Sequence, residues 1–338
     1  MAPDMEPQHV SNTSWAFATL GLPPGAEAWA ALLAAVVRVG PGMVSQAVAN
    51  TAWSFATQGL TPGAEARAAL EAAVVRVAPG MVPQAVANTA HSFATLGLMP
   101  GPEAQAALEA AVVRVVPGMN AQDVANTLWS FLTLTATWGV PLPACYPSLW
   151  RAAVGELDVG SVKDVQLRML FHAHLIHTEL VSGDVRDEVT FPPWIMREAR
   201  ESWMRGVRDD VTVSSDHKQI AAIIGNLGVR HEVECPSACG YFSVDVVLLD
   251  HEIAIEIDGP SHFINTSDAG EGAAPGDAAS RTTRTAKTEL RDMFLRMRYR
   301  TVFSVPWFEW AELSGSAEKK EYVAAKLREV GVSVPASA

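Results

Sequence analysis

Long apolar runs are missing from this sequence, and their absence excludes one class of protein. The longest apolar stretches, such as residues 30–37, are rich in alanine and much shorter than the roughly 18 residues that a membrane span needs. With 49% hydrophobic and 18% charged residues, the composition is that of a globular chain and not of a disordered one. We therefore expect no membrane partner.

Cysteine is also scarce. The 338 residues include three cysteines, Cys145, Cys235 and Cys239, and an odd number in a long chain does not indicate a disulfide framework. A reducing compartment is therefore expected. Cys235 and Cys239 could begin a metal site, but no second pair of cysteines or histidines follows at zinc-finger spacing, so zinc is not expected there.

Basic residues are in deficit too, with 25 Lys and Arg against 37 Asp and Glu and a net charge of -12. The chain as a whole is therefore not built to attract phosphate groups. Residues 281–300 differ, because they hold seven basic and only two acidic residues, a net charge of +5. Any contact with phosphate is expected to be local. The first ten residues show neither a signal peptide nor a transit peptide pattern.

What the sequence does have is a strict repeat of 38 residues. The Asn-Thr pair begins at Asn12, Asn50, Asn88 and Asn126, and the same register holds Phe17, Phe55, Phe93 and Phe131. A fixed period of this size is typical of solenoids, whose units bury their apolar faces against each other. Within one unit, residues 84–96 and 102–115 have helical patterns that end at glycine or proline. We therefore expect an α-solenoid of helical hairpins over residues 8–138, without β-strands.

Two columns of the repeat are candidates for binding. One is the arginine of each Val-Val-Arg-Val segment, Arg38, Arg76 and Arg114, which stacking would turn into a ladder. The ladder would either contact RNA or form a solvated face. The other column is Trp15, Trp53, His91 and Trp129. Its aromatic rings would either stack on bases or belong to the core.

This unit resembles a known family of repeats. A helical hairpin of 38 residues with the segment Ala-Asn-Thr-Ala-Trp-Ser-Phe-Ala-Thr is similar to the octotricopeptide repeats of algal organelle RNA-binding proteins. The resemblance covers residues 8–138. It implies that the array binds single-stranded RNA.

Beyond the repeats the pattern changes. Residues 139–213 are expected to be a helical connecting region, and residues 265–280 a mobile loop rich in Ala, Gly and Ser. The remaining pattern predicts a helix over 215–227, strands at 229–234, 241–249, 252–257 and 301–305, a basic helix over 285–297, and a last helix over 319–330.

The strands before and after Asp250-His251 predict a pair of facing carboxylates. If these two residues form an even-numbered hairpin loop, Asp245 lies opposite Glu256, and Asp258 shares their face because side chains alternate along a strand. Like charges in facing positions destabilise a sheet unless a cation or a proton compensates them. The set indicates a metal, a basic partner such as Lys287 or Arg291, or a structural cluster of ion pairs.

A second resemblance rests on these residues. The segment Ile-Ala-Ile-Glu-Ile-Asp-Gly-Pro-Ser-His-Phe at 253–263, then Thr285-Ala286-Lys287, then Ser-Val-Pro-Trp-Phe-Glu-Trp at 304–310 resemble the RAP domain. That domain occurs in organelle proteins that act on RNA and is related to the restriction-endonuclease-like fold. The resemblance implies an α/β domain with a mixed sheet over 214–313, its core at 252–313, followed by a C-terminal helix and tail at 314–338. Arg298 stands where the family usually has glycine.

The resemblance suggests two sets of site residues. The candidate RNA-binding residues are Arg38, Arg76, Arg114, His262, Arg284, Lys287, Arg291 and Arg298. The nuclease pattern of the wider superfamily is an Asp followed by Asp/Glu-x-Lys around a divalent metal. Asp245 and Glu256 match its first two positions and would hold the metal. Asp258 stands at the lysine position, and Lys287 could supply the missing charge.

Three functions remain open. The first is a multidomain RNA-binding protein without a cofactor, acting on mRNA or rRNA in processing, stability or translation, together with other organelle RNA-processing proteins. The resemblance places it in a chloroplast or mitochondrion. The second is a Mg²⁺-dependent endoribonuclease that uses Asp245, Glu256, Asp258 and Lys287. The third is a protein-interaction scaffold.

Overall fold

The computed structural model describes residues 4–155, 162–181, 191–209, 213–237, 239–266 and 283–334. The chain divides into two compact units. The helical unit comprises residues 1–202 and 263–290, and the sheet unit comprises residues 203–262 and 291–338. In the described part of the chain, no helix combines the length and the apolar character needed to cross a membrane.

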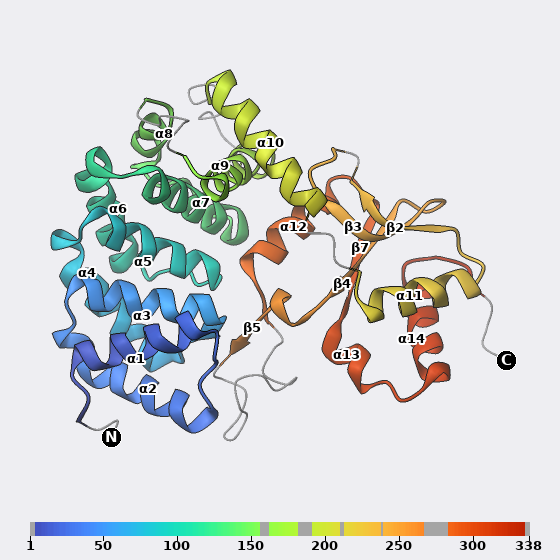
Figure 1. Cartoon of the computed structure of the whole chain (residues 1–338), viewed down its shortest axis with the longest axis horizontal. Coiled ribbons are helices and arrows are strands. Elements are labelled where there is room, and N and C mark those ends of the chain that lie inside the picture. The colour runs from blue at the N-terminus through green and yellow to red at the C-terminus, as the bar shows by residue number, and fades with distance from the viewer. Residues whose placement is uncertain are drawn as a thin grey trace. The chain divides into compact units, whose positions relative to one another are not determined.

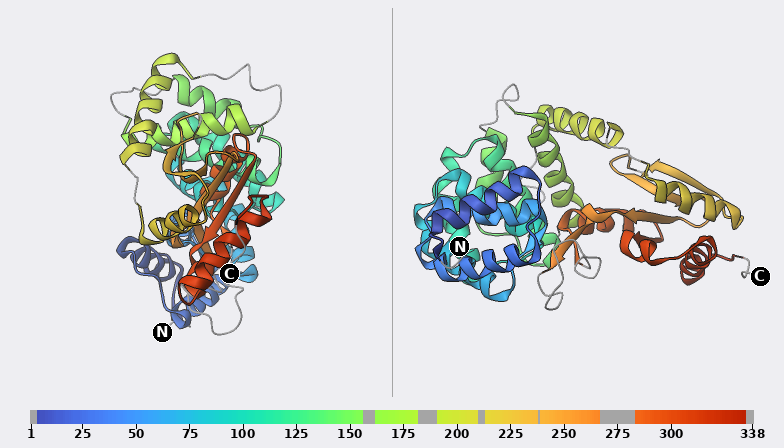
Figure 2. Two further views of the ribbon diagram at one scale, coloured as in Figure 1. Left: turned by 90° about the vertical axis from the view of Figure 1, so that its right-hand side faces the viewer. Right: turned by 60° about the horizontal axis from the view of Figure 1, so that its bottom comes forward.

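Seven helices of the helical unit follow the sequence repeat. They are α1 (Pro7–Leu20), α2 (Ala26–Val39), α3 (Ser45–Gln58), α4 (Ala64–Val77), α5 (Pro83–Thr95), α6 (Pro102–Val115) and α7 (Ala121–Trp138). The helices α1, α3, α5 and α7 contact each other in turn, and so do α2, α4 and α6 (Figure 1). Figure 2 shows these helices, coloured blue to green, from two further sides. The helices predicted over 84–96 and 102–115 are found as α5 and α6.

The repeated residues explain why the helices end where they do. Gly59 ends α3 with a φ of 62°, and Gly21 and Gly97 take the same left-handed conformation one repeat before and after it. Gly139 takes it at the end of the longer helix α7. This conformation favours glycine because it has no Cβ. The helices α2, α4 and α6 each run into a three-residue 3₁₀ turn that contains proline, at Gly40–Gly42, Ala78–Gly80 and Val116–Gly118. Met43 and Met81, which follow two of these turns, are completely buried.

One expectation for this segment is wrong, because it contains a short strand. β1 (Leu60–Thr61) lies between α3 and α4 and pairs in parallel with β5 (Phe263–Thr266), which also pairs with β6 (Thr283–Arg284). The chain leaves α3 in an extended conformation after Gly59, and its backbone groups need partners. The partner strand lies far away in the sequence, so no local pattern announced it. β1 interrupts neither neighbouring helix.

The connecting region is helical in the part of it that the structure describes. It contains α8 (Tyr146–Gly155), α9 (Asp164–Leu175), which continues as the π-helix η6 (Ile176–Leu180), and α10 (Pro193–Asp209). Buried histidines tie the region together. Trp129 donates a hydrogen bond to Nδ1 of His172 at 3.0 Å, and the hydroxyl of Tyr146 lies 2.8 Å from Nδ1 of His177. Burial lowers the pKa of His172 to about 3, so this ring is neutral.

The sheet unit is built on a mixed four-stranded sheet. Its strands are β2 (His231–Pro236), β3 (Ser243–Leu248), β4 (Ile253–Asp258) and β7 (Thr301–Pro306), in the order β2-β3-β4-β7. β3 is antiparallel to both of its neighbours, and β4 is parallel to β7. The helices are α11 (Ser215–Asn226), α12 (Ala286–Arg296), which begins in the helical unit, α13 (Trp307–Glu312) and α14 (Ser316–Glu329). Residues 307–312 had not been predicted to be helical.

One face of this sheet is the core of the sheet unit. Val246, Leu248, Ile253, Ile255 and Ile257 pack there with residues of α11 and α14, which also contact each other (Figure 1). Alternating strand residues place these side chains together, and burying them supplies most of the driving force for this unit. The C-terminal helix α14, expected to follow the domain as a separate segment at 314–338, thus contributes to its core.

The predicted parity of the hairpin is confirmed. Val246 pairs with Ile255 and Leu248 pairs with Ile253, as an even-numbered loop requires. The loop has four residues, Leu249 to Glu252, and not two. The loop predicted at 265–280 begins inside β5, and its residues from 267 onward lie outside the described part of the chain.

Candidate functional site

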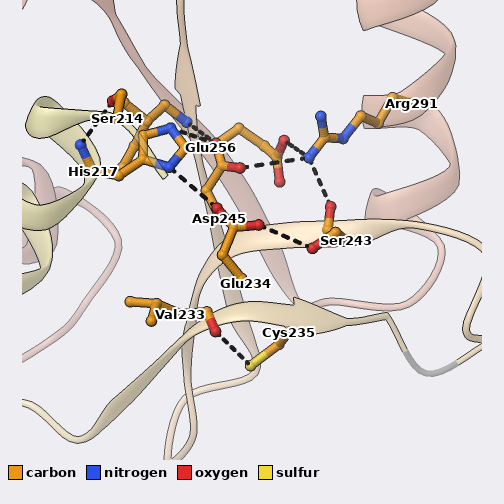
Figure 3. A network of polar contacts seen from close by, with 10 residues as sticks. Ser214, His217, Val233, Glu234, Cys235, Ser243, Asp245, Glu256 and Arg291 are labelled. Carbon is orange, nitrogen blue, oxygen red and sulfur yellow. Dashed lines mark hydrogen bonds and ion pairs between the residues drawn. The ribbon is translucent and has the colours of Figure 1, made fainter. Parts of the chain in front are cut away.

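Three carboxylates from neighbouring strands form a row across the sheet, contacted by His217 of α11 at one end and by Arg291 at the other. Glu234 and Asp245 occupy matching positions of β2 and β3, between the pairs Val233–Val246 and Cys235–Val244. Asp245 and Glu256 are the next residues after Val246–Ile255, the last pair of β3 and β4 (Figure 3). The strands β3 and β4 stop pairing at this point, and Oδ2 of Asp245 accepts a hydrogen bond of 2.6 Å from the backbone N–H of Ile257. Glu234, Asp245 and Glu256 are called the carboxylate row below.

Arg291 of α12 compensates one end of the row. Its Nη2 forms an ion pair with Oε2 of Glu256, lies 3.8 Å from Oδ1 of Asp245, and donates a 2.7 Å hydrogen bond to the carbonyl of Ser243. Glu256 is 1% exposed, and its other carboxylate oxygen has no hydrogen-bond partner among the described residues. Burial raises the pKa of Glu256 well above its ordinary value; Arg291 opposes this shift, and Asp245 adds to it.

His217 of α11 lies at the other end. Its Nδ1 lies 3.3 Å from Oε1 of Glu234, and its Nε2 lies 3.6 Å from Oδ2 of Asp245. Ser214 caps the start of α11, because its hydroxyl accepts a hydrogen bond from the backbone N–H of His217. His217 therefore lies in the first turn of the helix. The row therefore alternates acidic groups with an imidazole and a guanidinium.

Two further buried carboxylates of the RAP-like segment, Asp258 and Asp292, are paired as well. Asp258 is 1% exposed, and its Oδ1 lies 3.0 Å from Nδ1 of His262. Asp292 is 3% exposed and accepts a 3.1 Å hydrogen bond from Arg296. His262, a predicted RNA-binding residue, is thus held by a buried carboxylate that RNA cannot reach.

The predicted cations of the basic segment differ in their surroundings. Lys287 is exposed on the first turn of α12, and Arg291 lies one turn further in the ion pair with Glu256. Arg298 donates to the carbonyl of Phe294 and so caps the end of α12. Arg284 is half-buried in β6. Arg291 has a structural contact that would confound its use as a probe of RNA binding.

The arginine ladder is tied to the repeats themselves. Arg76 donates to the carbonyls of Gly40 and Met43, and Arg114 donates to those of Ala78 and Met81. Arg38 makes the corresponding bond to the carbonyl of Met5. Each guanidinium therefore caps the turn of the preceding unit, where helix carbonyls lack partners. All three arginines remain exposed residues.

The aromatic column changes character along the array. Trp15 is 48% exposed, Trp53 and His91 are half-buried, and Trp129 is buried beside His91, with the ring centroids 5.1 Å apart. Burial lowers the pKa of His91 to about 4. Trp15 is therefore accessible to a base, whereas Trp129 belongs to the core. An asparagine precedes each of these aromatic residues by three positions. Asn12 is exposed, and Asn50, Asn88 and Asn126 are half-buried.

Comparison with known protein families identifies one part of the chain. The family model for the RAP domain matches residues 255–326. These residues form a RAP domain. No curated protein matches the chain. RAP domains in general bind RNA.

The RAP domain starts later and ends later than the predicted core of 252–313. It includes Glu256, Asp258, His262, Lys287 and Arg291, and it continues through α13 into α14. Asp245 precedes it and was predicted from the hairpin register and from the nuclease pattern of the wider superfamily. Sequence reasoning missed Glu234 and His217, because no local pattern set the register of β2 or the position of α11.

Proposed function

We propose that this protein binds single-stranded RNA through its helical array and its RAP domain, and that it does so without cleaving the RNA. The RAP domain carries this proposal, since such domains generally bind RNA. The targets would be mRNA or rRNA in a chloroplast or mitochondrion, and the roles would be processing, stability or translation alongside other RNA-processing proteins.

The helical array would act as an α-solenoid of octotricopeptide type. Two observations support this proposal. Helices of like position contact each other in turn along the array, and the arginine contact recurs with the spacing of the sequence repeat. The asparagines and aromatic residues of α1, α3 and α5 then offer amide groups for base edges and rings for stacking, which are the two means by which proteins read single-stranded RNA.

The arrangement of the carboxylates favours binding over cleavage. Arg291 lies against both Asp245 and Glu256, in the place where a bridging divalent cation would have to bind. The lysine position of the nuclease pattern is Asp258, which is buried and paired with His262. The Mg²⁺-dependent nuclease would require Arg291 to leave a buried ion pair, which is costly.

The test uses the full chain and a fluorescein-labelled pool of random single-stranded RNA. Trp15→Ala should weaken binding by roughly 5- to 100-fold, because base stacking on an aromatic ring contributes about 1–3 kcal/mol. Trp194→Ala, an exposed tryptophan of α10 outside the repeat, is the matched control and should bind as the unmodified chain does. Lys287→Glu should also lower the salt dependence of binding.

The outcomes separate the three functions. No RNA binding by the unmodified chain, at low salt and with folding intact, would support a protein-interaction scaffold instead. Cleavage of the RNA pool on addition of Mg²⁺, lost in Glu256→Gln, would support the endoribonuclease. Equal losses in Trp15→Ala and Trp194→Ala would remove the array from the RNA-binding surface.

A further inference from the structure

The end of the carboxylate row at His217 carries a second inference, which does not depend on RNA binding. His217, Glu234 and Asp245 each offer one ligand atom, and these atoms all lie within 4.8 Å of one another. They come from three different elements, α11, β2 and β3. We propose that this group binds one divalent transition-metal ion, with Zn²⁺ as the best match, and a water molecule as the fourth ligand.

The ligand types and spacings fit zinc. An imidazole nitrogen and two carboxylate oxygens are ligands that Zn²⁺ accepts, whereas Mg²⁺ and Ca²⁺ prefer oxygen ligands alone. Zinc bonds of about 2.0–2.2 Å in a tetrahedral site place ligand atoms about 3.3–3.6 Å apart. Nε2 of His217 already lies 3.6 Å from Oδ2 of Asp245. Glu234 would turn its carboxylate from Nδ1 toward the same ring nitrogen.

The surroundings fit as well. The three side chains are 13%, 15% and 14% exposed, so the ion could enter and keep one position for water. Arg291 lies on the other oxygen of Asp245 and leaves Oδ2 to the histidine side. Oδ2 accepts one hydrogen bond, from Ile257, and a carboxylate oxygen has a second lone pair for a metal.

The bound ion would join α11 to β2 and β3 next to the place where β3 and β4 stop pairing. Two facing carboxylates on neighbouring strands repel each other, and a dication between them removes that repulsion. Metal binding should therefore stabilise the sheet unit. A site of this kind differs from the predicted metal position between Asp245 and Glu256, which Arg291 fills.

The test titrates the chelator-treated full chain with ZnCl₂ in competition with a chromophoric chelator. One equivalent should bind, and Glu234→Gln and His217→Ala should each weaken binding by at least about 100-fold, since loss of even an outer-shell partner costs 10- to 100-fold. The matched controls are Glu232→Gln, on the same strand, and His251→Ala, in the β3–β4 loop. Both should bind as the unmodified chain does.

Two further measurements make the result decisive. Zn²⁺ at about 100 times its dissociation constant should raise the unfolding midpoint of the unmodified chain by roughly 5–10 °C, and should not raise that of Glu234→Gln. Because Glu234→Gln keeps the size of the side chain, it tests the site even if His217→Ala fails to fold. Unchanged zinc affinity in Glu234→Gln would overturn the proposal. So would loss of binding in a Cys235→Ser, Cys239→Ser double variant, which would place the zinc on the cysteines.

Discussion

Replacing Arg291 with methionine tests whether the buried end of the carboxylate row is held together by charge. Methionine fills a similar volume but leaves Glu256 without its cation, beside Asp245 and at 1% exposure. Removing one partner of a buried ion pair typically costs about 3–5 kcal/mol. Glu256 can reduce this cost by taking up a proton, so we expect a loss of about 3 kcal/mol at pH 8.

The pH dependence follows from the raised pKa of Glu256. A carboxyl group whose pKa is raised on folding stabilises the folded state when the pH is below its ordinary pKa, here 4.5. This stabilisation is lost as the pH rises through the pKa of the folded state. Without Arg291 the folded-state pKa rises further. The destabilisation of Arg291→Met should therefore be larger at pH 8 than at pH 5.

The assay is urea unfolding at both pH values, followed by tryptophan fluorescence, since Trp310 lies in the core of the sheet unit. The double variant Arg291→Met, Glu256→Gln serves as the control. It removes both charges, so it should recover at least about 2 kcal/mol of the loss. A single variant within about 1 kcal/mol of the unmodified chain at pH 8, or a double variant no more stable than the single one, would refute the reasoning.

Three other predictions concern the array and the sheet. Arg76→Met should destabilise the helical unit by about 1–3 kcal/mol in thermal unfolding, because two carbonyls lose a charged donor; a loss no larger than that of Arg151→Met, an exposed arginine of α8, would contradict it. Gly59→Ala should destabilise the protein by about 1 kcal/mol, because the φ of Gly59 is 62°. Gly80 has no positive φ and lies in open space, so Gly80→Ala should leave the stability almost unchanged, and thermal unfolding of the two variants tests this difference. Incubation of the chain with RNA and Mg²⁺ should leave the RNA intact on a denaturing gel, and specific fragments would argue for the nuclease.

The sequence predicted best what depends on neighbouring residues. The helices of the array follow from a periodic pattern whose turns are marked by Gly97 and by proline. The facing of Asp245 and Glu256 follows from the parity of a short hairpin, because β3 and β4 are adjacent in the chain. In both cases a local rule determines the geometry.

Contacts between distant segments escaped prediction. His217 reaches the carboxylate row only because α11 packs on the sheet, and the pairing of β1 with β5 joins segments that share no pattern. The sequence predicted that the repeated arginines form a column. It did not predict that they donate to backbone carbonyls of the preceding turn, because such carbonyls have no signature in the sequence. Such contacts are set by tertiary packing.

The arginine contact also bears on how an array of this kind can change length. Each unit carries a donor on its second helix and acceptor carbonyls in the turn that follows, so one unit contains both halves of the connection to its neighbours. Duplicating or deleting 38 residues in register would therefore add or remove one complete connector and leave every other junction unaltered. Gene duplication could therefore lengthen such a protein without any compensating substitution at the new junction.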